Sequence, residues 1–549
     1  MKNKLLKLTI SSLLLLSLAS CKKSDNKIYD INIIYTSDVH CGITDNIGYS
    51  SFAAYKDELE KNEKYVTTID CGDAIQGDLV GAMSNGKYII DIMNEIDYDI
   101  FTLGNHEFDY GIDILRDRIN EFNGTTLSAN LKYIGKYEKK LDMVEPYKII
   151  KYGKRKVAYL GLTAPETLVA SNPQSFKEDG EYAYSFGAES KEAFYNLVQD
   201  YVDICNEKAD YVVLLSHLGS SSELIPFTSY DVINNTNGID VVLDGHAHFN
   251  IDQEYIKNKD NKNIPLTEVG TKLEEFEKIT ITKSGDIKLE QIKEYDKKSN
   301  KIDSLINKIN GELKDIKNEV IATSNMTLSI YDDEGIRLVR SRETAIGNLV
   351  SDAYRLITNS DIGIVNGGGV RANIEKGDIT FEAISKVHPY GNQLCVVKAL
   401  GSEIRDYLEF TSRATESEYK KDGKAFGENG AFANVSGLKY TIDTSIPSSV
   451  TLDGNQNFKT IDGAYRVKDI KVLQNNEYVD LDLNKEYTIA SHDFLLLSGG
   501  DGANMFVDNE VLSRGSLTDY QVLAKYIKEI LKGDLESKYS NTEGRITIL

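Results

Sequence analysis

Cysteine is scarce in this sequence, with five residues among 549. So few cysteines in a chain of this length do not form a disulfide scaffold. Cys41 and Cys71 each lie within two residues of a candidate metal ligand, so they could pair, add a soft ligand or pack as small apolar side chains. We expect packing, because that is the usual role of an unpaired cysteine.

Basic side chains are outnumbered: 63 lysines and arginines stand against 85 aspartates and glutamates, a formal net charge of −22. A protein this acidic repels nucleic-acid backbones and anionic lipid, which argues against a polynucleotide partner. We interpret the acidic excess as a solvated coat. A small anionic substrate could still bind where local cations override the overall field.

Long apolar runs are also missing after the first 20 residues, so no later segment is expected to cross a membrane. The sequence opens with three lysines and a short apolar run, residues 8–20, as in a signal peptide. The run ends in Leu18-Ala19-Ser20-Cys21, which resembles a bacterial lipobox. That resemblance implies cleavage before Cys21, lipidation of its thiol, and a protein anchored to a bacterial membrane outside the cytoplasm, at the cell surface or in the periplasm. The alternative is an ordinary signal peptide with a chance cysteine.

The length predicts more than one domain. Residues 1–20 are expected to be signal peptide and residues 21–27 a tether. Residues 28–299 alternate short apolar runs with longer mixed segments, which predicts an α/β domain with a largely buried sheet. Its strands are expected at residues 31–36, 65–69, 100–103, 157–162, 211–215 and 241–243, its helices at 50–61, 88–96 and 189–208, and a closing strand meander at 264–292.

Residues 300–321 repeat apolar side chains three and four positions apart, with lysine, glutamate and asparagine between them. This spacing predicts an amphipathic linker helix. Residues 322–549 are expected to form a second, smaller α/β (α+β) domain, with strands near 361–365, 394–399, 437–442 and 487–490.

Histidine is rare, and its placement is the strongest signal in the sequence. Five of the seven histidines lie in four short patches of the first domain, and a fifth patch adds an aspartate. Each patch follows a predicted strand. Because sites in α/β sheets form outside the carboxyl ends of strands, we expect the patches to converge. They are Asp38-Val39-His40, Cys71-Gly72-Asp73, Gly104-Asn105-His106-Glu107, Ser216-His217 and Gly245-His246-Ala247-His248.

Imidazole combined with carboxylate and amide oxygen is a ligand set for Zn²⁺, Mn²⁺ or Fe²⁺ rather than for Ca²⁺ or Cu⁺. The candidate ligands are more than one ion needs: Asp38, His40, Asp73, Asn105, His217, His246 and His248. Two divalent ions sharing a bridging carboxylate would use them all and lie roughly 3.5–4 Å apart. Such a pair activates a water molecule and clamps the attacking and leaving oxygens, which predicts phosphate-ester hydrolysis. A di-metal peptidase would need a ligand set richer in carboxylates.

In this order, the patches resemble the motifs of the calcineurin-like metallophosphatase superfamily. The fuller strings at residues 104–109 and 244–248 resemble its 5′-nucleotidase branch. The resemblance implies a four-layer αββα sandwich, with one metal held by Asp38, His40, Asp73 and His248 and the other by Asp73, Asn105, His217 and His246. It makes His106, oriented by Asp109, the residue that stabilises charge on the transferring phosphoryl group. Many relatives carry Gln or Asn at the position of His248, which leaves the metal preference open.

Segments of the second half resemble the nucleotide-binding domain of 5′-nucleotidases, at residues 340–348, 389–392 and 499–502, with a glycine-rich turn at 366–371. The resemblance implies that the substrate's charged groups meet Arg340 and Arg371, with Arg337 as a third candidate. It further assigns the ribose to Asp501, the base to Asn366 and Asn392, and a stacking contact, worth about 1–3 kcal/mol in nucleic-acid binders, to Tyr390.

Relatives usually have a second stacking aromatic six residues before the aspartate, where this sequence has Leu495. Phe494 lies one residue earlier, so either residue could face the base. His388 and His492 border these segments, and we expect them to support the substrate residues. By the same resemblance the two domains rotate relative to each other, with a hinge expected within residues 320–336.

The sequence therefore predicts a phosphoric ester hydrolase that acts on nucleotides, foremost nucleoside 5′-monophosphates. Alternative substrates at the same site are 2′,3′-cyclic nucleotides with 3′-nucleotides, UDP-sugars, and nucleoside di- and triphosphates. A hypothesis from another class is a surface lipoprotein that binds a ligand without turnover, and the intact ligand set argues against it.

Overall fold

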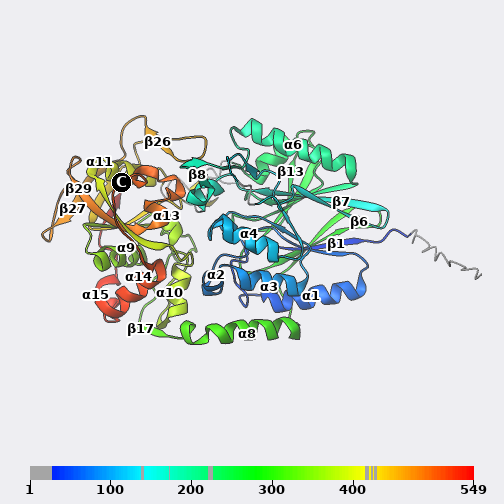
Figure 1. The fold of residues 1–549 in the computed structure, drawn as a ribbon, viewed down its shortest axis with the longest axis horizontal. Helices are drawn as coiled ribbons and strands as arrows, with labels where there is room; N and C mark the ends of the chain where they lie inside the picture. Colours follow the sequence, from blue (N-terminus) through cyan, green and yellow to red (C-terminus); the bar gives the residue numbers. More distant parts are fainter. Residues whose placement is uncertain are drawn as a thin grey trace, which may run out of the picture.

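A computed structural model describes residues 27–137, 141–171, 173–220, 227–414, 420–421, 424–425 and 429–549. The predicted lipidation site at Cys21, the signal peptide and most of the tether lie outside these residues. None of the helices in the described ranges is long and apolar enough to span a membrane. The chain forms two α/β domains, and helix α8 (Asn300–Lys317) runs along one edge of the molecule from the first toward the second (Figure 1).

Two six-stranded sheets form the centre of the first domain. The first has the order β16-β15-β1-β2-β3-β4, and β1 to β4 are parallel. The second has the order β13-β14-β12-β11-β7-β6, with β7, β11, β12 and β14 parallel. The first comprises β1 (Ile31–Thr36), β2 (Val66–Asp70), β3 (Ile100–Thr102), β4 (Thr125–Leu127), β15 (Phe276–Ile281) and β16 (Ile287–Ile292). The second comprises β6 (Tyr147–Tyr152), β7 (Arg155–Thr163), β11 (Tyr211–His217), β12 (Val241–Asp244), β13 (Asn250–Lys257) and β14 (Asn263–Val269).

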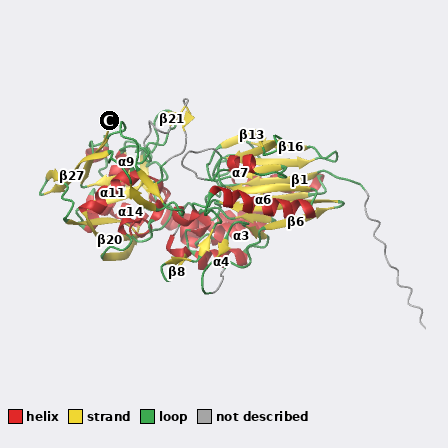
Figure 2. Cartoon of the chain, turned by 90° about the horizontal axis from the view of Figure 1, so that it is seen from above, coloured by secondary structure: helices red, strands yellow, loops and turns green. Residues whose placement is uncertain are grey.

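The side-chain alternation of a strand explains how the layers stack. In β1, Ile31, Ile33 and Tyr35 point into an apolar layer between the two sheets, while Ile34 points to the opposite face, under helices. The outer face of the first sheet is covered by α1 (Gly48–Asn62), α3 (Lys87–Ile96), α4 (Ile112–Glu121) and α8. That of the second is covered by α6 (Lys191–Lys208) and α7 (Ser229–Asn235). The result is the expected four-layer αββα sandwich (Figures 1 and 2).

The predicted meander at residues 264–292 is wrong in its connections. β14 pairs with β12 in the second sheet, whereas β15 and β16 extend the first sheet beside β1. Between them Gly270, Lys272 and Leu273 adopt positive φ values and carry the chain from one sheet to the other. The strands exist as predicted, but periodicity alone does not tell which sheet receives each strand.

The linker helix ends four residues earlier than predicted. α8 stops at Lys317, and Val320–Ser324 form strand β17, which pairs with β19 (Gly377–Thr380) of the second domain. The apolar residues Val320 and Ile321 extend the helical spacing in the sequence, but they belong to this strand. A strand therefore lies at the start of the segment in which the hinge is expected.

The second domain is built on a mixed five-stranded sheet of order β23-β18-β29-β20-β30 and a four-stranded sheet of order β28-β27-β24-β31. The first comprises β18 (Ile362–Asn366), β20 (Gln393–Leu400), β23 (Ala433–Ser436), β29 (Glu486–His492) and β30 (Val511–Thr518). The second comprises β24 (Leu438–Ile442), β27 (Val467–Gln474), β28 (Glu477–Asp480) and β31 (Ile546–Ile548). Its helices are α9 (Ala345–Thr358), α10 (Phe381–Val387), α11 (Gly401–Thr411), α13 (Asp493–Leu496), α14 (Asp519–Lys525) and α15 (Glu536–Tyr539).

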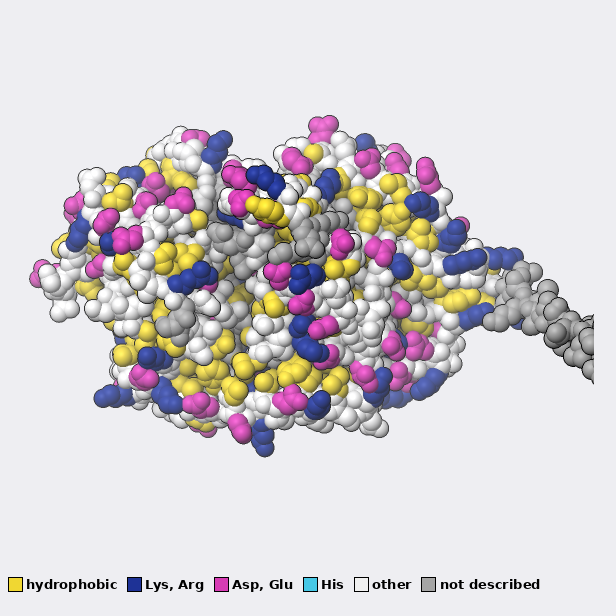
Figure 3. Space-filling model, in the orientation of Figure 1, with side chains coloured by type: hydrophobic (Ala, Val, Ile, Leu, Met, Phe, Trp, Pro, Cys, Tyr) yellow, Lys and Arg dark blue, Asp and Glu magenta, His cyan; other side chains and the backbone are white. Residues whose placement is uncertain are grey.

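Both domains also contain shorter helices and strands. Those of the first domain are α2 (Leu79–Ser84), α5 (Thr167–Ala170), β5 (Lys132–Tyr133), β8 (Lys177–Glu178), β9 (Glu181–Tyr182) and β10 (Tyr184–Ser185). Those of the second are β21 (Lys420–Lys421), β22 (Lys424–Ala425), β25 (Val450–Leu452) and β26 (Phe458–Ile461). Acidic and basic side chains are interspersed over the face seen in Figure 3, as in a solvated coat.

Candidate functional site

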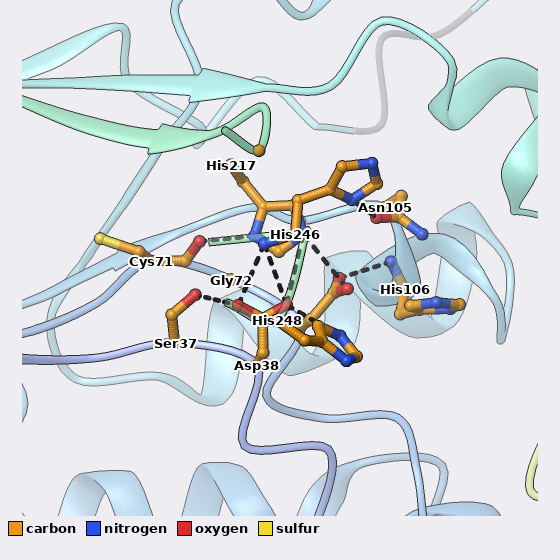
Figure 4. Close-up of polar contacts among 12 residues, drawn as sticks. Ser37, Asp38, Cys71, Gly72, Asn105, His106, His217, His246 and His248 are labelled. Atoms are coloured by element: carbon orange, nitrogen blue, oxygen red, sulfur yellow. Dashed lines mark hydrogen bonds and ion pairs between the residues drawn. The ribbon is translucent and has the colours of Figure 1, made fainter. Parts of the chain in front are cut away.

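All seven predicted metal ligands lie at or just after the carboxyl ends of strands. Asp38 and His40 follow β1, Asp73 follows β2 and Asn105 follows β3 in the first sheet. In the second sheet His217 ends β11, and the last two ligands, His246 and His248, follow β12. Because the two sheets stack, these strand ends meet, and the side chains converge as Figure 4 shows.

The backbone of this site is strained. Five of the seven ligands have positive φ values between 45° and 78°: Asp38, His40, Asp73, His246 and His248. Such conformations cost about 1–3 kcal/mol each and concentrate where function fixes the direction of a side chain. Two motif glycines make room for the carboxylates, because a Cβ at Gly104 would lie 2.3 Å from Asp73 Oδ1 and one at Gly245 2.6 Å from Asp38 Oδ2.

The ligand atoms form two overlapping groups, and within each group all of them lie within 4.8 Å of one another. One group contains Asp38, His40, Asp73 and His248, and the other contains Asp73, His217 and His246. The Oδ1 atom of Asn105 lies 2.8 Å from Nδ1 of His246, which puts the amide beside the second group. Asp73 belongs to both groups, so the arrangement is a di-metal site with a shared carboxylate.

The hydrogen bonds of two histidines test whether cations fit. Nδ1 of His217 donates to the carbonyl of Cys71 (2.8 Å), so in the neutral ring the buried Nε2 would present a lone pair to Asp73 Oδ2 at 3.1 Å. Nδ1 of His40 similarly faces the carbonyl of Gln76 (3.2 Å), which leaves its Nε2 as an acceptor 3.1 Å from Nε2 of His248. Each of these buried pairs needs a proton or a metal ion between its two facing atoms, so the residues fit divalent cations.

The pKa shifts of Asp38 and His217 also indicate a site that holds positive charge. Burial raises the pKa of Asp38, but the charges of His217 and His248 outweigh it and hold the pKa at about 2. Burial lowers the pKa of His217, yet Asp73 and Asp38 raise it well above its usual range. The site therefore draws positive charge to His217, either as a proton or as a metal ion that competes with it.

His106 lies against the metal groups without joining them. Its Nδ1 lies 2.7 Å from Asp109 Oδ2, and its backbone N–H donates to Asp73 Oδ1 at 2.8 Å. Burial lowers the pKa of His106, but Asp109 and Asp73 outweigh it and the pKa is raised. Ser171 donates to the other oxygen of Asp109 at 2.9 Å. A positively charged imidazole held in this way can stabilise an anion beside the metal groups.

Two further glutamates have roles that the sequence did not predict. Glu107 is fully buried and accepts the backbone N–H groups of Asp73, Ala74 and Gly104 at 2.8–2.9 Å, so it ties two ligand loops together. It lies within a recognised motif, which could have drawn attention to it. Glu166 Oε1 lies 3.2 Å from His246 Nε2 and orients that ring, although nothing in the sequence around it signals this contact.

The cysteines within the described residues neither pair with each other nor belong to the metal groups. All four described cysteines are free and buried. Cys41 Sγ contacts the carbonyl of Ile75 at 3.1 Å and Cys71 Sγ that of Leu243 at 3.6 Å. Burial raises the pKa of both thiols, so they stay protonated and pack as expected.

A cavity of about 1540 Å³ joins the metal groups to the second domain. Its wall on the first domain includes Asp73, His106 and His248. Every predicted substrate residue lines it on the other side: Arg340, Asn366, Arg371, Tyr390, Asn392, Phe494 and Asp501. Arg337 lines it too.

Aromatic rings bring the two domains into contact inside this cavity. The ring of Tyr390 lies 5.6 Å from that of His106, across the domain boundary. Of the two candidates for a second stacking residue, Phe494 lines the cavity, whereas Leu495 is fully buried in the core of the second domain. Gly500 leaves space for the Phe494 ring, because a Cβ there would lie 2.2 Å from it.

Asn366 lines the cavity and is also held within a hydrogen-bond network of the second domain. Both ends of its amide are engaged inside the protein, with Oδ1 3.1 Å from His492 Nε2 and Nδ2 donating to Asp501 Oδ2 at 2.6 Å. Its amide therefore contacts the predicted ribose residue, and its contact with the base stays a prediction. His388 hydrogen-bonds the carbonyl of Gly369 at 2.6 Å, next to this network.

Both halves of the chain match known protein families. The family model for the calcineurin-like phosphoesterases matches residues 31–250, and that for the 5′-nucleotidase C-terminal domain matches residues 320–508. The chain is 26% identical to a trifunctional nucleotide phosphoesterase protein of Bacillus subtilis, over 94% of this chain but only 35% of that longer protein. It is also 26% identical to the 5′-nucleotidase of Bos taurus, over 94% of this chain and 91% of that protein.

Among solved structures, a 5′-nucleotidase precursor from Thermus thermophilus superposes with a TM-score of 0.76 at 24% identity. The match covers 95% of this chain and 99% of that one. At this identity the likeness establishes the fold of both domains and their order along the chain.

Proposed function

Because this chain belongs to the 5′-nucleotidase family of calcineurin-like phosphoesterases, we propose that its substrates are nucleoside 5′-monophosphates, which it converts to nucleoside and phosphate. It is a phosphoric ester hydrolase of the 5′-nucleotidase type. One observation carries the choice of substrate: the metal groups and the predicted nucleoside residues line a single cavity. A phosphate at the metal groups would thus have its nucleoside in the second domain.

The metals, when bound, would supply Lewis-acid charge and an activated water. Asp38, His40, Asp73 and His248 would hold one ion, and Asp73, Asn105, His217 and His246 the other. His106 is positioned to stabilise negative charge on the phosphoryl group, because Asp109 raises its pKa and fixes its ring.

The second domain would orient the nucleotide substrate. Arg340 and Arg371 line the cavity, where their charges suit phosphate oxygens. The charge of Arg371 reaches the metal groups: burial lowers the pKa of His248, and Arg371 lowers it further. Tyr390 and Phe494 offer aromatic faces for a base, and Asp501 offers a carboxylate for sugar hydroxyls.

The decisive experiment measures phosphate release by the chain from Lys22 onward with Mn²⁺, Zn²⁺ or EDTA. The panel contains a 5′-monophosphate, a 3′-monophosphate, a 2′,3′-cyclic nucleotide, a nucleoside diphosphate and a UDP-sugar, with an Asp73→Asn variant as the inactive control. Fastest metal-dependent release from the 5′-monophosphate supports the proposal. A faster alternative substrate would replace the proposed substrate but retain the di-metal chemistry, and no release from folded, metal-loaded protein would favour a binding lipoprotein.

We further propose that the protein is anchored to a bacterial membrane by lipid on Cys21 and acts outside the cytoplasm. The lipobox-like sequence supports this, and two acyl chains suffice for stable anchoring. Mass spectrometry of the N-terminal peptide from membrane fractions should show the diacylglyceryl adduct, and Cys21→Ala should release the protein. Wild-type protein recovered without lipid in the soluble fraction would disprove the anchor.

A further inference from the structure

Three polar side chains form a continuous hydrogen-bonded chain behind the nucleoside wall of the cavity. His492 Nε2 lies 3.1 Å from Asn366 Oδ1, and Asn366 Nδ2 lies 2.6 Å from Asp501 Oδ2. His492 and Asn366 are 1% and 3% exposed, so water does not compete for these bonds. Of the three, Asn366 and Asp501 have predicted contacts with substrate, whereas His492 has none.

The direction of every proton in this chain can be deduced. Nδ1 of His492 accepts the backbone N–H of Leu495 at 3.4 Å and so caps helix α13. Burial lowers the pKa of His492 to about 4, so the ring is neutral and carries one proton, which must be on Nε2. That N–H donates to Asn366 Oδ1, which in turn directs the Asn366 NH₂ group at Asp501.

Local backbone geometry maintains the arrangement. A Cβ at Gly369 would lie 2.8 Å from Asn366 Oδ1 and 3.5 Å from His492 Nε2, so the glycine-rich turn leaves space for their hydrogen bond. Asp501 itself has φ 54°, between two glycines. Its second oxygen, Oδ1, faces Gly430 on the cavity wall, where a Cβ would lie 3.5 Å away.

We propose that His492 is a positioning residue for the sugar: it fixes the Asn366 amide so that Asp501 presents Oδ1 to the ribose hydroxyls. This inference rests on the proposed function. Without the His492 donor, Asn366 can rotate its amide and turn its carbonyl oxygen toward the carboxylate. Asp501 would then lose its donor, and burial, which already raises its pKa, would favour the protonated form.

The test compares His492→Leu, which removes both ring nitrogens at similar volume, with His492→Gln, whose amide nitrogen can replace the Nε2 donor. Each enzyme is assayed on the preferred nucleoside 5′-monophosphate and on its 2′,3′-dideoxy counterpart, which lacks both sugar hydroxyls. We expect His492→Leu to raise KM about tenfold or more on the ribonucleotide, with kcat nearly unchanged. On the dideoxynucleotide it should behave as wild type, and His492→Gln should recover most of the loss.

Equal losses on both substrates would show a general structural role and overturn the inference, as would an unchanged KM on the ribonucleotide. If His492→Leu does not fold, His492→Met, which also lacks both ring nitrogens, takes its place and must give the same substrate pattern. Wild-type protein that releases no phosphate from any 5′-monophosphate would overturn the proposed function itself, before any variant is compared.

Discussion

Replacing Glu166 should weaken the binding of one of the two metal ions and leave the binding of the other unchanged. Glu166 contacts His246 at 3.2 Å, and His246 belongs only to the group formed with Asp73 and His217. Both ring nitrogens of His246 face acceptor oxygens, Nδ1 that of Asn105 and Nε2 that of Glu166. With a metal ion held by Nδ1 and Asn105, Nε2 would carry the proton that Glu166 accepts. A carboxylate in this position orients the imidazole and increases its basicity as a ligand.

The structure sets the expected size of the effect. Loss of such a carboxylate typically costs 10–100-fold in metal affinity, about 1.4–2.7 kcal/mol. The side chains of Glu166 and His246 are only 13% and 15% exposed, so solvent screens their interaction weakly. We therefore expect the upper half of that range for Glu166→Ala. Glu166→Gln, which keeps an acceptor oxygen without the charge, should lose less.

Calorimetric titration of Mn²⁺ into metal-free protein gives both affinities in one experiment. In Glu166→Ala, the ion held by the group of Asp73, His217 and His246 should bind more weakly. The ion held by Asp38, His40, Asp73 and His248 should keep its affinity. Replacing the exposed Glu192 of α6 by alanine serves as the control for lost acidic charge. Equal weakening of both ions, or no weakening of either, would refute the reasoning.

Three more predictions follow from the site and the core. Asp73→Asn should abolish binding of both ions and all turnover, because Asp73 belongs to both groups; retention of one ion at full affinity, measured by metal analysis, would contradict the shared carboxylate. His106→Asn should lower kcat about 10²–10³-fold with two ions still bound, and a loss of metal instead would make it a ligand. Burial raises the pKa of Glu277 to about 8, against 4.5 in the unfolded chain, so between these values the folded protein holds a proton that the unfolded chain releases. The free energy of unfolding of the wild type, relative to that of Glu277→Gln, should therefore fall by about 1.4 kcal/mol per pH unit as the pH rises through this window. If urea unfolding gives the two proteins the same dependence on pH, the pKa of Glu277 is not raised.

The strands and the metal patches could be predicted because each depends on local sequence. Short apolar runs mark buried strands, and polar residues that follow parallel strands must meet at one edge. β1 begins and ends as predicted, at Ile31 and Thr36. The partner sheet of β14 and the end of α8 could not be predicted, since both depend on long-range pairing.

The contacts that orient the ligands were less accessible to sequence reasoning. Glu166 is separated from His246 by 80 residues, and only the fold brings them together. Asn366 was assigned to the base by its motif, but its hydrogen bonds depend on His492, which is 126 residues away. Motif position gives a residue's neighbourhood, whereas the atom that each polar group faces depends on packing.

The acidic excess of the whole chain is not found in the lining of the cavity. The chain carries a net charge of −22, yet the arginines that line the cavity equal its carboxylates in number: Arg337, Arg340, Arg371, Arg413 and Arg514 against Asp73, Asp109, Glu166, Asp493 and Asp501. Charges separated by more than about 8–10 Å through solvent are largely screened at physiological ionic strength, while those inside a cavity are screened much less. An anionic nucleotide at the metal groups is therefore governed by these arginines and by the metal ions. We expect the acidic coat to oppose binding to polyanions, whose charge extends beyond the cavity.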